Sequence, residues 1–231
     1  MDELRVCHLG RVDYREAAAL QRALRERVIA RELPDVMLLL EHPPVYTLGR
    51  RSQPGDLPLG EDWCRARGID VVRTERGGKL TYHGPGQLVG YPIVRVDDVA
   101  GYVAAMERAI VAALREAGVE AHTRDGLAYT GVWVGERKIA SIGVHLSHGV
   151  SMHGFAVNVV NDLAPFEWVV ACGLQGVRMT SLAAEGSPEG LACFRKRMGH
   201  AMARELGRRQ RLVTPQRLGI GDPVAPVASV T

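Results

Sequence analysis

Hydrophobic and polar positions along this chain follow two alternating periods, which predicts helices interleaved with strands. Apolar residues recur every three or four positions in three stretches, as in amphipathic helices. The first follows Asp13, an N-cap residue, and ends before Pro34, and the second covers residues 98–117 and ends at Gly118. Ser187-Pro188 is typical of a helix start and predicts the third, whose apolar face runs to Leu206.

Apolar runs and alternating positions predict the strands. We expect strands over residues 4–9, 36–40, 69–73, 88–94, 133–134, 137–146 and 150–159, and an irregular segment over 41–49. Gly135-Glu136 fits a two-residue hairpin turn with glycine at its first position. No repeat or linker divides the chain. We therefore predict one α/β (α+β) domain over residues 1–213, a mixed β-sheet with flanking helices, followed by a proline-containing C-terminal tail, 214–231.

Composition narrows the class of protein. The chain is 46% hydrophobic and 24% charged, like an ordinary globular protein. No apolar run approaches the roughly 18 residues of a membrane span, and the acidic N-terminus lacks a secretory h-region, so we expect a cytoplasmic location and no membrane contact. A net charge of +3 without a basic stripe argues against nucleic acid. We take a monomer as the expected state.

Cysteine and histidine spacing indicates neither a metal site nor a disulfide framework. The cysteines are Cys7, Cys64, Cys172 and Cys193, with no Cys-x-x-Cys pair, and the eight histidines are scattered. We predict no metal and no cofactor. Cys7, Cys64 and Cys193 fit packing roles in predicted strands and helices.

The stretch from Arg76 to Gly90 is dense in glycine and also carries Thr81 and His83. Glycine lets the backbone approach a ligand closely, and free N–H groups can hold an anion or a carbonyl oxygen. Tight turns around a strand would need the same glycines. The polar residues threaded through the stretch favour a binding loop.

Lys138 and Cys172 are the candidates for chemistry. Of 29 basic residues only Lys79, Lys138 and Lys196 are lysines, and a lysine, unlike an arginine, can lose its proton. Lys138 shares a strand face with Ala140, Ile142 and Val144, where burial would favour a neutral amine suited to acid–base work. A lysine at a strand end can equally extend to solvent.

Cys172 precedes Gly173 after an apolar run that we take as a strand end, a suitable way to present a nucleophile. It would need an activating base or field, because a free thiol is mostly protonated at neutral pH. Packing is the alternative role. His83 and His153 could orient a substrate carbonyl or serve as core residues. Ser141–Gly143 and Gly154–Ala156 combine small and apolar residues, as in a narrow apolar channel.

Together these motifs resemble the octanoyltransferases of lipoate biosynthesis. The resemblance rests on Glu41-His-Pro-Pro-Val-Tyr-Thr-Leu-Gly49, Arg76-Gly-Gly-x-x-Thr-x-His-Gly-Pro-Gly-Gln-Leu-Val-Gly-Tyr-Pro92, Arg137-Lys-Ile-Ala-Ser-Ile-Gly143, His153-Gly-Phe-Ala-x-Asn158 and Ala171-Cys-Gly-Leu174. It covers residues from about 5 to 206 in unbroken motif order. It implies the catalytic-domain fold of lipoate and biotin protein ligases.

The resemblance also implies an activity and its residues. It implies an octanoyl-[acyl carrier protein]:protein N-octanoyltransferase that takes octanoyl (or lipoyl) groups from acyl carrier protein. The acceptors would be apo lipoyl domains of 2-oxoacid dehydrogenase complexes and the glycine cleavage H protein. Cys172 would carry the acyl group as a thioester, and Lys138 would act as its acid–base partner. Substrate-binding positions fall on Arg76, Gly77, Gly78, Lys79, Leu80, Thr81, Tyr82, His83, Ser141, Ile142, Gly143, Gly154, Phe155 and Ala156. For the oxyanion hole we consider the N–H groups of Gly77, Gly78 and Gly173.

Other functions stay open at this stage. An ATP-dependent lipoate or biotin protein ligase would share the fold, although Gly84 and Gln87 stand where lipoate ligases typically have Asp and Asn. A non-catalytic module for acylated carriers would keep the glycine loop without needing both Cys172 and Lys138. A cysteine hydrolase is disfavoured, because no Cys–His–Asn order is visible.

Overall fold

The computed structural model describes residues 2–174 and 176–221, whose strands form two sheets. The strands are β1 (Glu3–Arg11), β2 (Asp35–Glu41), β3 (Val45–Leu48), β4 (Asp70–Arg73), β5 (Thr81–His83), β6 (Gln87–Ile93), β7 (Gly131–Val134), β8 (Arg137–Ser147), β9 (Val150–Asn158) and β10 (Arg209–Val213). The helices are α1 (Tyr14–Ile29), α2 (Gly60–Arg65), α3 (Val99–Glu116) and α4 (Leu191–Glu205). Short 3-10 turns are η1 (Pro54–Asp56), η2 (Leu127–Tyr129), η3 (Ala164–Phe166), η4 (Ala171–Gly173) and η5 (Pro215–Leu218).

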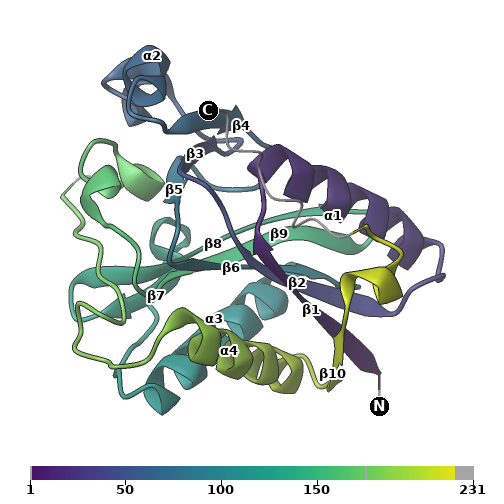
Figure 1. The fold of residues 1–231 in the computed structure, drawn as a ribbon. Coiled ribbons are helices and arrows are strands. Elements are labelled where there is room, and N and C mark those ends of the chain that lie inside the picture. The colour runs from purple at the N-terminus through teal and green to yellow at the C-terminus, as the bar shows by residue number, and fades with distance from the viewer. Residues whose placement is uncertain (1, 175, 222–231) are drawn as a thin grey trace, which may run out of the picture.

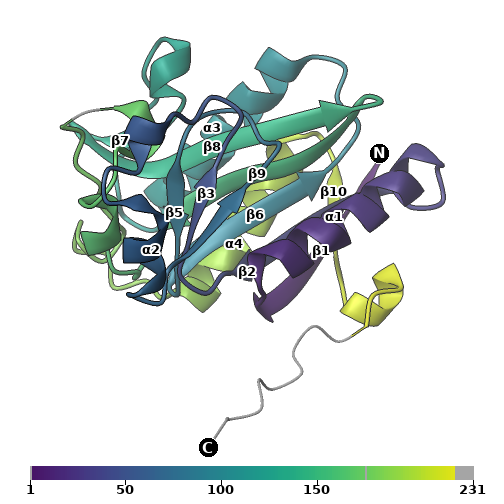
Figure 2. The same ribbon diagram turned by 90° about the horizontal axis from the view of Figure 1, so that it is seen from above.

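The larger sheet is mixed and has helices on both faces. Its strand order is β10-β1-β2-β6-β9-β8-β7, with β1 parallel to β2 and β10 and the remaining pairs antiparallel. Helices α3 and α4 cover one face and α1 the other (Figure 1). The smaller sheet, β4-β3-β5, lies beside α1 over the larger sheet (Figure 2). The predicted mixed sheet with flanking helices is confirmed.

Local sequence signals account for the helix ends. The Asp13 side chain accepts hydrogen bonds from the N–H groups of Arg15 and Glu16, and Asp98 caps α3 through Ala100 N–H. These caps satisfy N–H groups that have no partner inside the helix. Gly118 follows α3 with a φ of +82°, a conformation that glycine adopts without a steric penalty.

Three apolar clusters hold the layers together. One joins the large sheet to α3 and α4 and includes Met106 and Phe194, and a second joins the opposite face to α1 and includes Leu24. The third lies between the small sheet, α2 and the η3 and η4 turns, around Tyr46 and Leu80. The small sheet therefore has its own core beside that of the large sheet.

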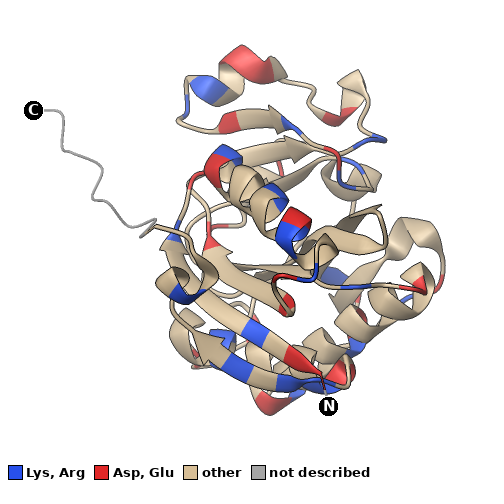
Figure 3. Cartoon of the chain, turned by 90° about the vertical axis from the view of Figure 1, so that its right-hand side faces the viewer, with Lys and Arg blue, Asp and Glu red and all other residues tan. Residues whose placement is uncertain are grey.

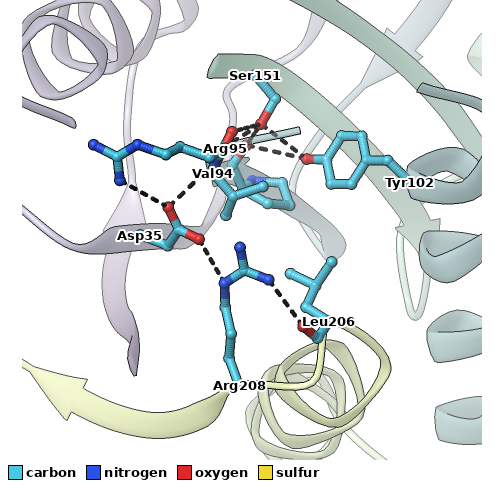
Figure 4. Close-up of polar contacts among 8 residues, drawn as sticks. Asp35, Val94, Arg95, Tyr102, Ser151, Leu206 and Arg208 are labelled. Carbon is cyan, nitrogen blue, oxygen red and sulfur yellow. Dashed lines mark hydrogen bonds and ion pairs between the residues drawn. The ribbon is translucent and has the colours of Figure 1, made fainter. Parts of the chain in front are cut away.

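A buried carboxylate joins three segments at the start of the inner strand β2. Asp35 is 6% exposed and pairs with Arg208 Nε at 2.5 Å, while its Oδ1 accepts a hydrogen bond from Arg95 N–H (Figure 4). Burial raises the pKa of Asp35 although both arginines oppose the shift. Nearby, Tyr102 donates to Ser151 Oγ at 3.1 Å. These contacts link α3, β9 and the chain after α4 to the strand β2.

Edge strand β10 was not predicted, and charges line it. Arg209 and Arg211 both pair with Glu3 on the neighbouring strand β1. Figure 3 shows blue and red segments on the strands near the N-terminus. Charged side chains on an edge strand oppose pairing with a second chain. Beyond it, within the predicted tail, Leu218 is fully buried against the cluster that joins the sheet to α1, and residues 222–231 lie outside the described residues.

Several local predictions were wrong. Residues 45–48 of the segment predicted as irregular form β3, whose four residues are all buried between β4 and β5. Helix α4 begins at Leu191 and not at Ser187, because the Ser187 hydroxyl donates to Ala117 O at the end of α3. Cys193 was expected in the core but is exposed, whereas Cys7 and Cys64 are buried.

A substitution at Gly90 tests how closely strands β6 and β9 pack at Phe155. Residue 90 pairs with Phe155, and a Cβ at position 90 would overlap the Phe155 ring. We expect Gly90→Ala to lower the free energy of unfolding by about 1–3 kcal/mol, as overpacking does, measured by urea denaturation. Gly55→Ala is the control, since a Cβ there meets nothing within 4 Å. Equal stability of the two variants would contradict this packing.

Candidate active site

A cavity of about 180 Å³ lies between the large sheet and the glycine-rich loop. Strands β8 and β9 form its floor, residues 76–83 cover one side, and Cys172 borders it from the η4 turn. Every predicted site residue lines it except Leu80 and Tyr82. The cavity therefore brings the predicted residues together from four separate segments, 76–83, 138–143, 154–156 and Cys172.

Leu80 and Tyr82 are buried behind the cavity walls and support them. Leu80 is fully buried, and its carbonyl accepts a hydrogen bond from Cys172 N–H at 2.8 Å. Tyr82 is 4% exposed, and its ring packs against Tyr46 and Phe166 in the core of the small sheet. Both residues hold the walls in place instead of facing the cavity.

We predicted that Cys172 lies at the end of a strand, but it lies in a tight turn. Its φ is +57°, in the left-handed region that residues with a Cβ rarely adopt, and Gly173 follows at φ +69°. Such a conformation costs about 1–3 kcal/mol and persists only where the surroundings impose it. Here the turn leaves the thiol partly exposed, with Sγ 3.5 Å from Ser141 Oγ.

Lys79 places a positive charge beside this turn. Its Cε would lie 2.7 Å from a Cβ at position 173, so the lysine stem occupies the space that a side chain on Gly173 would need. The ammonium is 3.8 Å from the carboxylate of Asp56, which is 4% exposed. Asp56 also binds the turn directly, because its carbonyl accepts a hydrogen bond from Val170 N–H.

Lys138 is a buried residue of β8 that lines the same cavity. It is 2% exposed, and Nζ donates to the carbonyl of Thr130 at 2.8 Å. Its amine lies against Gly131, where a Cβ would be 3.3 Å from Nζ, and 5.2 Å from the centre of the Trp133 ring. Among the described residues no hydrogen bond joins Nζ to Cys172 Sγ directly, although both residues line the cavity.

The strand face predicted for Lys138 is interrupted. The register between β7 and β8 shifts, so that Trp133 pairs with Lys138 and Val132 with Ala140. This irregularity turns Lys138 into the cavity, whereas Ala140 packs in the core. Strict alternation along the strand could not have shown this.

Arg76 brings a second positive charge, and it is only 7% exposed. Its guanidinium donates to the Thr47 hydroxyl and carbonyl and to Gly77 O, and within the described ranges it has no carboxylate within ion-pair distance. Burial lowers the pKa of Arg76, and a negative charge on Cys172 would oppose that shift. A buried guanidinium without a carboxylate partner favours negative charge in the cavity.

Buried histidines line or brace the inner end of the cavity in neutral form. Burial lowers the pKa of His153 to about 3 and that of His42 to about 4, and it holds the pKa of His83 well below its usual value. His83 Nδ1–H donates to the Gln87 side-chain oxygen at 2.8 Å, since that oxygen can only accept. His42 likewise donates through Nδ1 to Val12 O and accepts from the Tyr91 hydroxyl.

Some lining residues were not predicted from the sequence. Tyr14 comes from the first turn of α1, Tyr91 from β6, and Leu127 and Thr130 from the segment before β7. Tyr14 carried only a helix signal in the sequence, and Thr130 contributes through its backbone carbonyl, so no side-chain pattern could reveal either. His153 was considered as a candidate, and it does line the cavity.

The described residues contain neither a metal-binding cluster nor a membrane-spanning helix. In residues 2–174 and 176–221, no cluster of three or more His, Cys, Asp or Glu side chains could hold a metal ion. None of the helices in the same ranges combines the length and the apolarity that crossing a bilayer demands.

Comparisons with solved structures support the fold. An archaeal bipartite lipoate protein ligase from Thermoplasma acidophilum, studied with its E2 lipoyl domain, superposes with a TM-score of 0.71 at 20% identity, over 94% of this chain and 91% of that one. A lipoate-protein ligase A bound with ATP gives a TM-score of 0.70 at 18% identity, over 94% and 92%. The expected ligase-like catalytic fold is confirmed, and at these identities the likeness concerns the fold alone.

Sequence comparisons identify the family and its activity. Residues 13–203 match the lipoyl protein ligase A/B catalytic domain family. Octanoyltransferases from Solibacter usitatus and Mycobacterium ulcerans are 50% and 46% identical, over 77% and 78% of this chain and 81% and 78% of theirs. One from Dictyoglomus turgidum is 42% identical over 85% of this chain and 84% of its own. The chain thus belongs to the lipoyl protein ligase A/B catalytic domain family and, within it, to the octanoyltransferases, acyltransferases of lipoate biosynthesis.

Proposed function

We propose that this octanoyltransferase works through a thioester on Cys172, with Lys138 as acid and base. The observation that carries the proposal is that a partly exposed thiol and a buried amine, from distant parts of the chain, border one cavity. Arg76 and Lys79 supply positive charge on the side of the thiol. A non-catalytic acyl-binding module would need no such pair.

In the first half-reaction the carrier thioester enters with its acyl chain in the cavity. Lys138, in its neutral form, takes the proton of Cys172, and the thiolate attacks the acyl carbonyl carbon. A carbon–sulfur bond to Cys172 forms, the bond to the carrier sulfur breaks, and the proton moves from Lys138 to the departing thiolate. One thioester replaces another, so no ATP is required.

In the second half-reaction a lysine of the acceptor attacks the Cys172 thioester. Lys138 accepts a proton from the attacking amine, an amide forms, and the Cys172 sulfur leaves and regains a proton from Lys138. Base catalysis matters because an ordinary lysine amine, with a pKa of about 10.4, is almost entirely protonated at neutral pH.

Gly78 is the best-supported donor for the oxyanion among the three glycines considered. Gly77 N–H donates to Val144 O and Gly173 N–H donates to Val170 O, so both are occupied. Gly78 N–H has no backbone acceptor among the described residues, its φ is +84°, and it lines the cavity. We assign it, with the Lys79 ammonium, to the negative charge that develops on the carbonyl oxygen.

For the partners we propose octanoyl-acyl carrier protein as donor and apo lipoyl domains as acceptors. The acceptors include those of 2-oxoacid dehydrogenase complexes and the glycine cleavage H protein. The Thermoplasma ligase of the same fold, studied together with a lipoyl domain, supports an acceptor of this kind. We further propose that the chain acts as a monomer in the cytoplasm.

A ligase activity is the nearest alternative. The two solved structures compared are ligases, but their identity to this chain is 20% or less, whereas the octanoyltransferases compared reach 42–50%. Gly84 and Gln87 replace the acid and amide that we associate with lipoate ligases. We therefore propose acyl transfer that does not use ATP.

The thioester can be trapped directly. Incubation with octanoyl-acyl carrier protein, without ATP, is expected to add one octanoyl group to Cys172, visible by mass spectrometry and removed by neutral hydroxylamine. Cys172→Ala should abolish the adduct and the transfer to a lipoyl domain. Cys193→Ala, at the exposed cysteine, is the control and should keep both. Transfer that persists in Cys172→Ala, or that requires ATP and releases pyrophosphate, would contradict the thioester mechanism.

The role of Lys138 is tested by removing its amine while keeping its stem. We expect Lys138→Met to lower the rate of Cys172 acylation by about a hundredfold or more, as the loss of a general base does, measured by rapid quench and mass spectrometry. Lys196→Met, at an exposed lysine of α4, is the matched control and should acylate at the wild-type rate. A folded Lys138→Met enzyme with an unchanged acylation rate would remove Lys138 from the chemistry.

A further inference from the structure

The cavity runs from Cys172 toward a polar wall, and the strand register gives its length. Ser141, which contacts Cys172 Sγ, lies three positions before Val144 on β8, and Val144 pairs with His153 on β9. Three residues of strand span about 10 Å. An extended octanoyl chain, with C–C bonds of about 1.5 Å, spans roughly 9 Å from its carbonyl carbon to its methyl group.

Midway along this path the two strands carry no side chains. Gly143 pairs with Gly154, and both line the cavity. A Cβ on Gly143 would come within 3.0 Å of Gly77 O, so the backbone of the covering loop packs directly against the strand at this point. The cavity lining continues from Ser141 past Gly154 to Tyr14 and His153.

Three side chains joined by hydrogen bonds make up the wall. The Tyr14 hydroxyl donates to Thr74 Oγ1 at 3.2 Å, and Thr74 Oγ1 lies 3.4 Å from His153 Nε2. Tyr14 and His153 are each 3% exposed. The Tyr14 ring also stacks on His83, with centroids 6.1 Å apart and planes 14° apart. The wall is therefore fixed by contacts from both layers.

A second pocket lies directly behind this wall. It has a volume of about 280 Å³ and shares Tyr14 and His153 with the acyl cavity, while Thr74 and several charged residues of α1 and β4 complete its lining. Tyr14 and His153 thus face both spaces. The wall is one side-chain layer thick, and beyond it is room that a longer chain would enter.

His153 has features that its role in the core does not explain. Its φ is +60°, an unfavourable conformation for a residue with a Cβ, and its Nδ1 is buried without a hydrogen-bond partner among the described residues. Glycine would adopt this backbone without strain. A histidine retained here at the cost of strain and of an unpaired polar atom points to a use for its side chain.

We propose that Tyr14, Thr74 and His153 form the end wall that sets the length of the acyl chain. This inference rests on the proposed function, since it places the acyl carbonyl at Cys172. An eight-carbon chain ends with its methyl group against the wall. A longer chain must either fold back on itself or break the Tyr14–Thr74–His153 contacts. Both events cost free energy and therefore lower the rate at which a longer chain is loaded onto Cys172.

The test measures which acyl chains load onto Cys172. Thioesters of N-acetylcysteamine with octanoyl, dodecanoyl and hexadecanoyl groups serve as donors, so that no carrier contact affects the comparison, and the adduct is quantified by mass spectrometry. The informative variant is His153→Gly, which removes the wall side chain and relieves the backbone. His148→Gly is the matched control, because His148 has a φ of +51° but does not line the cavity.

We expect the wild-type protein to load octanoyl about tenfold or more faster than dodecanoyl, the discrimination that a closed apolar pocket gives. In His153→Gly the two rates should come within roughly threefold of each other, with octanoyl loading retained, and hexadecanoyl should become a substrate. Thr74→Ala, which breaks the wall from outside the sheet, should shift the preference in the same direction. His148→Gly should keep the wild-type profile.

Two results would overturn the inference while leaving the proposed function intact. One is a wild-type protein that loads all three chains equally well. The other is a His153→Gly variant and a Thr74→Ala variant that load octanoyl yet retain the wild-type preference. Failure of the wild-type protein to form any adduct at Cys172 would instead contradict the proposed function. Because the main prediction is a gain of longer substrates, a misfolded variant cannot produce it.

Discussion

One backbone hydrogen bond, from Cys172 N–H to the carbonyl of Leu80, governs the geometry of the site. It holds a left-handed turn at the proposed nucleophile, and it ties that turn to Leu80, the residue just before β5. The Lys79 stem fills the space above Gly173, and Asp56 binds both Lys79 and the turn. The strained turn is thus held by contacts with the smaller layer, and its thiol meets the large sheet at Ser141 Oγ.

The electrostatic setting follows from burial. Arg76 is covered by protein, its hydrogen bonds go to neutral oxygens, and no carboxylate in the described ranges compensates its charge. The nearby histidines are held neutral, so they add no competing charge at physiological pH. An anion formed on the sulfur or on an acyl oxygen therefore meets a site that already favours it, without the protein having to reorganise.

The sequence predicted the layers well because periodicity reports burial directly. Asp13, Asp98 and Gly118 fixed helix ends through local bonds, which a sequence shows. The errors came from long-range contacts: Ser187 turned away from its helix toward Ala117, and the register shift beside Lys138 depends on the pairing of two strands. For the site, motif residues gathered as expected. Tyr14 and the Thr130 carbonyl escaped prediction, since their roles exist only once distant segments meet.

The separate core of the small sheet has a consequence for the reaction cycle. The proposed nucleophile, Cys172, is attached to that smaller layer through Leu80, whereas Lys138 and His153 are built into the large sheet. The hydrogen bond from Gly77 N–H to Val144 O joins the layers beside the cavity. The distance between the Cys172 sulfur and the Lys138 amine is therefore set by how the smaller layer packs on the large sheet.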